Sequence, residues 1–155
     1  MSVEVRPATV ADISELVALM TEFYAEAGFV LPSGPAERAF RTLLADARLG
    51  AVWLAEIGGA AVGHAVMTVC FSMEYGGLRA FIDDLYVQQR ARRQGAGAAL
   101  LDAVRVAADE RGVRALHVEV GPDNPTARRL YDRAGYVESG HLFLSLPLAA
   151  PVHTA

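Results

Sequence analysis

The chain of 155 residues has the length of one domain with a single core, and 53% of its residues are hydrophobic. Its formal net charge is −4, which disfavours general binding to nucleic acid. It shows no uncharged apolar run of about 18 residues, no secretory N-terminus and only one cysteine, so we expect a cytoplasmic protein that does not bind membranes.

Apolar periodicity and turn residues divide the chain into helices and strands. In chain order we predict a strand (3–6), a helix (10–27), a loop (29–35), a helix (36–46), two strands joined by a Gly-Gly turn (51–57 and 60–71), a strand (79–87), a helix (95–111), a strand (115–120), a helix (124–134) and two closing hairpin strands (136–138 and 142–146). Before the first helix, Thr9 and Asp12 form a capping-box pattern.

This order predicts an α/β fold with a mixed sheet of six to seven strands and four helices that flank both of its faces. The fourth strand, the helix after it and the fifth strand form a right-handed βαβ unit, so these two strands should be parallel. Residues 1–147 are expected to form a single domain, and residues 148–155 a frayed tail.

An arginine-rich turn with two glycines lies between the fourth strand and its helix. Arg90, Arg92 and Arg93 place three positive charges in an acidic chain, and Gly95 and Gly97 remove side chains where the helix starts. Because a helix N-terminus offers unpaired amides and the positive end of the helix dipole, the turn suits a phosphate group. The lack of any lysine excludes a P-loop, and a leucine stands where a dinucleotide fingerprint needs a small residue. The alternative is a solvated turn whose glycines only cap the helix.

Two further motifs accompany the turn. The pattern N-x-x-A-x-x-L-Y-x-x-x-G-Y/F runs from Asn124 to Tyr136, and the stretch VRPAT opens the chain at 5–9. Together with the R-x-x-G-x-G turn at 92–97, these motifs resemble the GNAT acetyltransferase superfamily over nearly the whole chain. Arg93 departs from the many members that have glycine at this position.

The resemblance implies that acetyl-CoA binds around the turn. Its pyrophosphate would contact the backbone of 92–98, and its pantetheine arm would extend the edge of the fourth strand, which is splayed from the fifth. The Val87 N–H would polarise the thioester carbonyl, and Asn124 would hydrogen-bond the pantetheine. The implied cofactor-binding residues are Leu85, Tyr86, Val87, Arg92, Arg93, Gln94, Gly95, Ala96, Gly97, Ala98, Asn124, Ala127 and Tyr131.

An amine that attacks a thioester needs a base, and the departing sulfur benefits from an acid. Tyr131 is the implied acid, with a core aromatic residue as the alternative. Asp83 and Asp84 are adjacent on a strand and therefore face opposite sides. The run FIDDLYV resembles the diamine and thialysine acetyltransferase branch, which implies Asp83 as the base, directly or through water, and Asp84 as a group that helps to hold a cationic substrate. Glu119 is a competing base, and a structural role for both aspartates is the alternative.

The resemblance further implies an enzyme that acetylates a primary amine of a small cationic molecule. Glu22 and Tyr24, near the end of the first helix, are expected to contact this acceptor. An amino acid, an aminoglycoside or a protein N-terminus is an alternative acceptor, and a CoA-binding sensor without catalysis is an alternative function. No residues have metal-ligand spacing, so we expect no metal, and the family implies a homodimer. His64 and His117 are expected to be satisfied core or edge residues.

Overall fold

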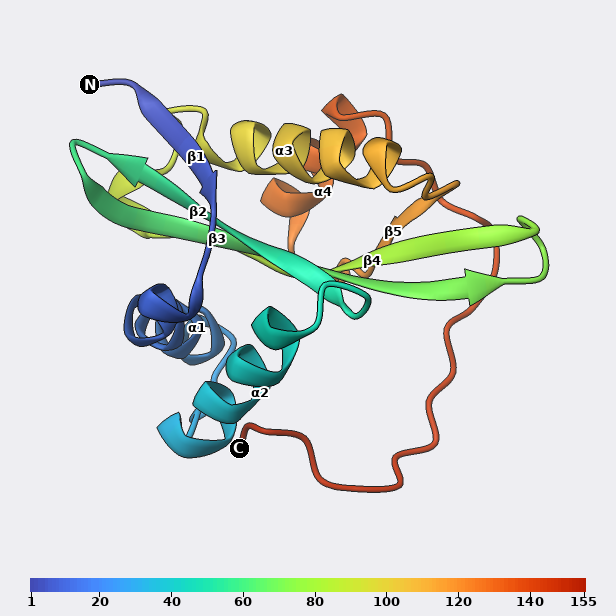
Figure 1. The fold of residues 1–155 in the computed structure, drawn as a ribbon, viewed down its shortest axis with the longest axis horizontal. Helices are drawn as coiled ribbons and strands as arrows, with labels where there is room; N and C mark the ends of the chain where they lie inside the picture. Colours follow the sequence, from blue (N-terminus) through green and yellow to red (C-terminus); the bar gives the residue numbers. More distant parts are fainter.

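One mixed sheet separates two pairs of helices, with α1 and α2 on one face and α3 and α4 on the other (Figure 1). The computed structural model describes residues 1–155. The strands are β1 (Val3–Pro7), β2 (Gly50–Ile57), β3 (Ala60–Ser72), β4 (Gly77–Val87) and β5 (Leu116–Val118). The helices are α1 (Ile13–Glu26), α2 (Ser33–Ala45), α3 (Ala96–Glu110) and α4 (Pro125–Arg133), with 3-10 turns η1 (Val10–Asp12) and η2 (Gln89–Ala91). None of the four α-helices has the length and apolar character that crossing a membrane requires.

The strands lie in the order β1-β2-β3-β4-β5. All neighbours are antiparallel except β4 and β5, which are parallel. The predicted α/β fold with a parallel pair formed by the fourth and fifth strands is therefore confirmed. These two strands pair at only three positions, which end at Ile82 and Val118. Beyond that point the last five residues of β4, 83–87, have only β3 as a neighbouring strand. The edge of β4 that faces away from β3 is therefore open.

Hydrophobic cores fill both faces of the sheet. Alternate side chains of β2 enter opposite cores, because successive residues of a strand point to opposite faces. Val52 and Leu54 pack with α1 and α2, whereas Trp53 and Ala55 pack with α3. Because both faces are covered, the central strands read as nearly continuous apolar runs.

A β-bulge interrupts β4 in the middle of its acidic pair. Val66 and Met67 are neighbours on β3, but their partners on β4 are Asp84 and Ile82, so Asp83 is an extra residue. The bulge reverses the alternation of β4. Before the bulge, the even-numbered apolar side chains of β4 face α3. After the bulge, the even-numbered Tyr86 faces α1. The half of β4 that starts at Asp83 therefore presents its alternate side chains to the opposite faces of the sheet.

The predicted closing hairpin is absent, and the sheet has five strands rather than six to seven. Residues 137–153 make no hydrogen bond between backbone groups, because no strand of this chain lies against them. The predicted frayed tail is wrong at its end, where Thr154 and Val30 exchange two backbone hydrogen bonds of 2.8 Å. The last residues are thus fastened near α2, on the other side of the molecule from α4 (Figure 1).

Candidate active site

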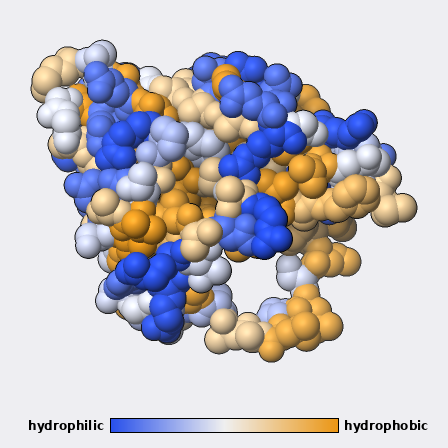
Figure 2. Space-filling view, in the orientation of Figure 1, coloured by the Kyte–Doolittle hydropathy of each residue, from blue (hydrophilic) through white to orange (hydrophobic).

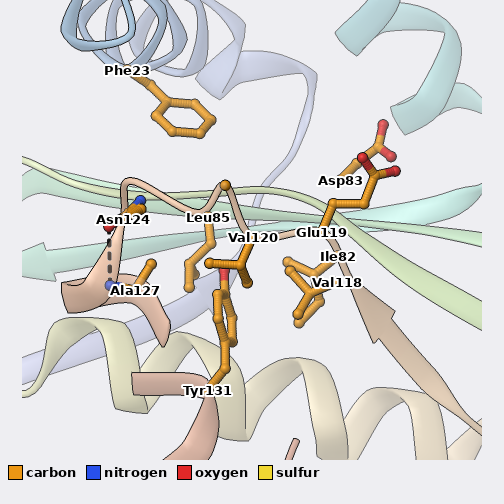
Figure 3. A pocket seen from close by; sticks show the side chains of 11 residues that line it. Phe23, Ile82, Asp83, Leu85, Val118, Glu119, Val120, Asn124, Ala127 and Tyr131 are labelled. Atoms are coloured by element: carbon orange, nitrogen blue, oxygen red, sulfur yellow. Dashed lines mark hydrogen bonds between the residues drawn. The ribbon is translucent and has the colours of Figure 1, made fainter. Parts of the chain in front are cut away.

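A pocket of about 210 Å³ opens where β4 and β5 separate (Figure 3). Its walls come from α1, the second half of β4, the segment that follows β5, and α4. The lining residues are Phe23, Ile82, Asp83, Leu85, Val118, Glu119, Val120, Gly121, Asn124, Ala127 and Tyr131. Asp83 and Leu85 of β4 thus line one cavity together with three residues of the distant Asn124–Tyr136 motif, because the early end of β5 leaves room between the strands.

The turn before α3 presents a row of unused donors. None of the backbone amides from Arg93 to Ala98 donates a hydrogen bond within the chain. Gly95 caps α3 in a left-handed conformation, with φ of +88°. Arg93 also has a positive φ of +63°, a conformation that glycine adopts more easily. Six free amides at a helix N-terminus fit an anionic phosphate group.

The Arg92 side chain is engaged elsewhere. Its Nε donates to the Val87 carbonyl at 2.9 Å, and its Nη2 donates to the Glu26 carboxylate at 2.7 Å. Its guanidinium also lies 5.7 Å from the centre of the Tyr86 ring. Arg92 therefore ties the end of β4 to α1.

The free edge of β4 faces the pocket. Gln88 donates to the Val62 carbonyl at 2.8 Å, and hydrogen-bonded pairs alternate along antiparallel strands. The amides of Leu85 and Val87 therefore point away from β3, into the gap where β5 is missing. Such an edge can pair with an extended ligand that carries amides.

Helix α4 places two polar side chains beside this edge. Asn124 caps the helix, since its Oδ1 accepts from the Ala127 amide at 3.1 Å. Tyr131 is 6% exposed and packs 5.5 Å from the Tyr136 ring. Its hydroxyl makes no hydrogen bond within the chain and points toward Val120 in the pocket (Figure 3). Burial, and secondarily Tyr136, raise the pKa of Tyr131 to about 12, so the phenol keeps its proton at neutral pH.

The two aspartates have different surroundings. Asp83 lines the pocket, and its carboxylate lies on the same side as that of Glu119 (Figure 3). Desolvation, and then the charges of Asp84 and Glu119, raise the pKa of Asp83 above its usual range. Asp84 is buried, 3.9 Å from Nε2 of His64. His64 is fully buried and neither ring nitrogen has a hydrogen-bond partner, so the expectation of a satisfied histidine is wrong.

The two predicted acceptor contacts on α1 are separated. Burial, and then the charges of the nearby Asp84 and Asp83, raise the pKa of Tyr24 to about 12. Glu22 instead accepts hydrogen bonds from Gln88 at 3.0 and 3.1 Å and from the Tyr86 hydroxyl at 3.2 Å. It lines an open surface hollow next to the arginine turn rather than the pocket.

Sequence reasoning missed the apolar lining of the pocket. Phe23, Val118 and Val120 were not predicted as site residues. Phe23 lies three residues after Met20, a buried position of α1, so helical spacing was the available signal. Val118 and Val120 line the pocket because β5 ends at Val118, and the sequence pattern does not mark this end.

Comparison with known proteins identifies the family. The model of the acetyltransferase (GNAT) family matches residues 15–136. The chain belongs to this family. It is an acyltransferase, and the free amides and open strand edge described above fit acetyl-CoA as its co-substrate. No group of three or more His, Cys, Asp or Glu side chains is placed to hold a metal ion.

Three relatives illustrate the likeness. The chain is 28% identical to the uncharacterized N-acetyltransferase YhfO of Bacillus subtilis (strain 168), over 92% of this chain and 97% of that protein. The structure of integron cassette protein HFX_CASS3, from the mobile metagenome of Cole Harbour Salt Marsh, is 48% identical, with a TM-score of 0.89 and coverage of 96% and 92%. The aminoglycoside N-acetyltransferase AAC(6')-Iy in complex with CoA is 16% identical, with a TM-score of 0.80 and coverage of 95% of both chains. This last likeness is one of fold.

Proposed function

We propose that the protein transfers an acetyl group from acetyl-CoA to a primary amine of a small cationic molecule, by direct attack in a ternary complex. The observation that carries this proposal is the unpaired acidic wall of the pocket. Asp83 and Glu119 form no ion pair, and the only basic side chain within 4.0 Å of the Asp84 carboxylate is His64. Such a wall favours a cationic acceptor.

The arginines that could have neutralised this wall lie elsewhere. Arg79 stacks on the Phe81 ring at 5.3 Å, and Arg90 forms no ion pair. Pairing of the aspartates to these two arginines would have argued against a cationic substrate. The resemblance of the FIDDLYV run to the diamine and thialysine branch supports the same acceptor class.

The residues that would hold acetyl-CoA are the amides of 93–98, the β4 edge, Asn124 and Ala127. When bound, the co-substrate supplies a thioester whose acyl group is transferred. Asp83 would take the proton of the incoming ammonium group, and its raised pKa makes it a better base near neutral pH than an ordinary carboxylate. The Val87 amide would donate to the carbonyl oxygen. As the C–N bond forms and the C–S bond breaks, Tyr131 would give its proton to the leaving sulfur, and the second proton that the attacking nitrogen loses would restore the Tyr131 hydroxyl.

Several finer assignments belong to this proposal. Asp84 and Tyr24 would favour binding of the cationic acceptor, and Glu22 would act at the outer rim. A water bound to Asp83, or Glu119, is the alternative base. An amino acid, an aminoglycoside or a protein N-terminus is the alternative acceptor. We also propose a cytoplasmic homodimer, as the resemblance implies.

The Tyr131→Phe substitution tests the mechanism and separates it from a non-catalytic CoA sensor. The ring stays in its packed position and only a hydroxyl without a hydrogen bond is lost. We expect kcat to fall by about 10²-fold or more, with CoA affinity and thermal stability unchanged. Tyr136→Phe is the matched control and should keep its kcat. Unchanged turnover of the Tyr131 variant would exclude its role as the acid, and a wild-type protein that binds CoA without any turnover would favour the sensor.

A further inference from the structure

Two of the four buried polar side chains lack hydrogen-bond partners. Hydrophilic residues are spread over the visible surface of the molecule (Figure 2), and few lie inside it. The buried polar residues are Asp12, His64, Ser72 and Asp84. Asp12 binds the Arg6 guanidinium at 2.8 and 2.9 Å, and the Ser72 oxygen accepts from a backbone amide at 3.2 Å. His64 and Asp84 form no hydrogen bond, although burial without partners is costly for polar groups.

These two side chains lie next to each other on one face of the sheet. On the paired strands β3 and β4, His64 is opposite Tyr86 and Val66 is opposite Asp84, so His64 and Asp84 are diagonal neighbours. Nε2 of His64 lies 3.9 Å from Oδ2 of Asp84. This distance is about 0.7 Å longer than the usual limit of about 3.2 Å for a hydrogen bond. In active sites without substrate such bonds are often long, and they tighten when the substrate binds.

The groups around this pair leave His64 as the donor for Asp84. The Tyr86 hydroxyl donates to two glutamates of α1, at 3.2 and 3.1 Å. Phe40 of α2 packs against the imidazole with 6.3 Å between ring centres, and it carries no polar atom in its side chain. His64 is the only basic side chain within 4.0 Å of the Asp84 carboxylate.

The surroundings of the His64 ring also favour one position for its hydrogen. If the hydrogen of a neutral ring were on Nδ1, it would lack an acceptor, and the lone pair of Nε2 would face a carboxylate. A hydrogen on Nε2 instead points at Oδ2 and leaves only an acceptor unpaired at Nδ1. Unpaired acceptors are tolerated inside proteins better than unpaired N–H groups. An imidazolium ring would carry the same hydrogen on Nε2.

Asp84 belongs to the acceptor side of the pocket. It directly follows Asp83, which lines the pocket. Burial, and then the charges of Asp84 and Asp83, raise the pKa of Tyr24 to about 12, so both carboxylates act on the same part of α1. The Asp84 side chain stays 11% exposed, which leaves room for contact with a bound cation. A donor behind the carboxylate would fix which of its oxygens meets that cation.

We propose that His64 is a positioning residue of the acceptor site. Its Nε2–H donates to Oδ2 of Asp84, and this bond directs the other carboxylate oxygen toward the second ammonium group of a diamine. His64 thereby supports the selection of a diamine over a monoamine without touching either. This role rests on the proposed function, whereas the bond between His64 and Asp84 does not.

The kinetic test compares 1,4-diaminobutane with butylamine. His64→Leu keeps a side chain of similar size and removes the donor. We expect KM for the diamine to rise about tenfold or more, the usual worth of a hydrogen bond to a charged group, while KM for butylamine and for acetyl-CoA stays the same. His64→Gln retains an N–H donor and should restore most of the preference for the diamine. Met67→Leu, a buried β3 residue on the opposite face of the sheet, is the control and should leave all three values unchanged.

The double variant His64→Leu/Asp84→Asn separates positioning from a general effect on packing. If His64 acts only through Asp84, the double variant has the same diamine KM as Asp84→Asn alone. Three results would overturn the role: an unchanged diamine KM in His64→Leu, an equal rise in all three KM values, or effects of the two substitutions that multiply.

A spectroscopic test of the bond needs no turnover. Long-range 1H–15N NMR of the uniformly 15N-labelled wild-type protein shows which ring nitrogens carry hydrogen, and the His64 signals are those that vanish in His64→Gln. We expect a hydrogen on Nε2 of His64 and a shifted Nε2 signal in Asp84→Asn. A hydrogen on Nδ1 alone would overturn the bond, even where His64→Leu fails to fold. A protein that acetylates no amine would refute the proposed function and leave this measurement to decide the bond.

Discussion

The Gly63→Ala substitution tests whether the end of β4 positions the co-substrate. A Cβ at residue 63 would lie 2.5 Å from the carbonyl oxygen of Tyr86 and 3.3 Å from Cα of Val87. The first distance falls 0.9 Å short of the 3.4 Å at which ordinary contact begins. The backbone of β4 must therefore move by most of an ångström, directly at the amides that face the pocket. We expect a loss of about 1–3 kcal/mol in stability from this overpacking.

The functional effect should exceed the effect on stability. A displacement of about 1 Å at a positioning group can cost roughly 10²-fold in rate. We therefore predict a fall of this size in kcat/KM for acetyl-CoA, with weaker CoA binding by calorimetry below the melting temperature. Gly34→Ala on α2 is the control, because its Cβ would meet only the Arg38 side chain at 3.4 Å. A Gly63 variant that is less stable but binds CoA and turns over normally would refute the role of the β4 end.

Four further substitutions probe the electrostatics. Asp83→Asn should lower kcat/KM by about 10²-fold or more, because a general base is lost. Glu119→Gln removes a charge that raises the pKa of Asp83, so the acidic limb of the kcat/KM–pH profile should move to lower pH. Arg92→Lys should weaken CoA binding about tenfold, because an ammonium group cannot make both side-chain bonds that tie β4 to α1, and unchanged binding would show that only the charge matters. The Arg6 guanidinium, bonded at 2.8 and 2.9 Å, lowers the pKa of Asp12 from 3.8 to about 2, so this pair stabilises the fold above pH 3.8 and loses its effect as the pH falls through 2. Asp12→Asn should cost about 1 kcal/mol in urea unfolding at pH 7, a value reduced for the exposure of Arg6, and no cost below pH 2.

The sequence predicted most of the fold because its strongest signals are local. The capping box was right, since the Thr9 amide donates to the Asp12 carboxylate at 2.8 Å. The helix predicted after the glycine turn begins at Ala96, and Asn124 caps α4. These features depend on residues within a few positions of each other, where propensity and spacing carry the information.

The features that were missed depend on contacts between distant segments. The bulge at Asp83 arises from the register of β4 against β3, which no local pattern contains. The alternation of 142–146 predicts a strand, and this prediction is wrong for the chain by itself, because a strand forms only where a sheet edge receives it and none in this chain does. Arg92 occupies the first position of the phosphate-turn motif, but its side chain is hydrogen-bonded to β4 and to α1. Its partner on α1, Glu26, lies 66 residues earlier in the chain.

The central claim is tested most directly by thiol release from acetyl-CoA in the presence of matched amines. The pair 1,4-diaminobutane and butylamine differs by one cationic group, and lysine, an aminoglycoside and a peptide with a free N-terminus complete the panel. We predict turnover with the diamine at a higher kcat/KM than with the monoamine, and loss of this preference in Asp84→Asn. Thiol release that does not exceed the amine-free background with any of these acceptors would contradict the proposed acetyl transfer to a small cationic amine.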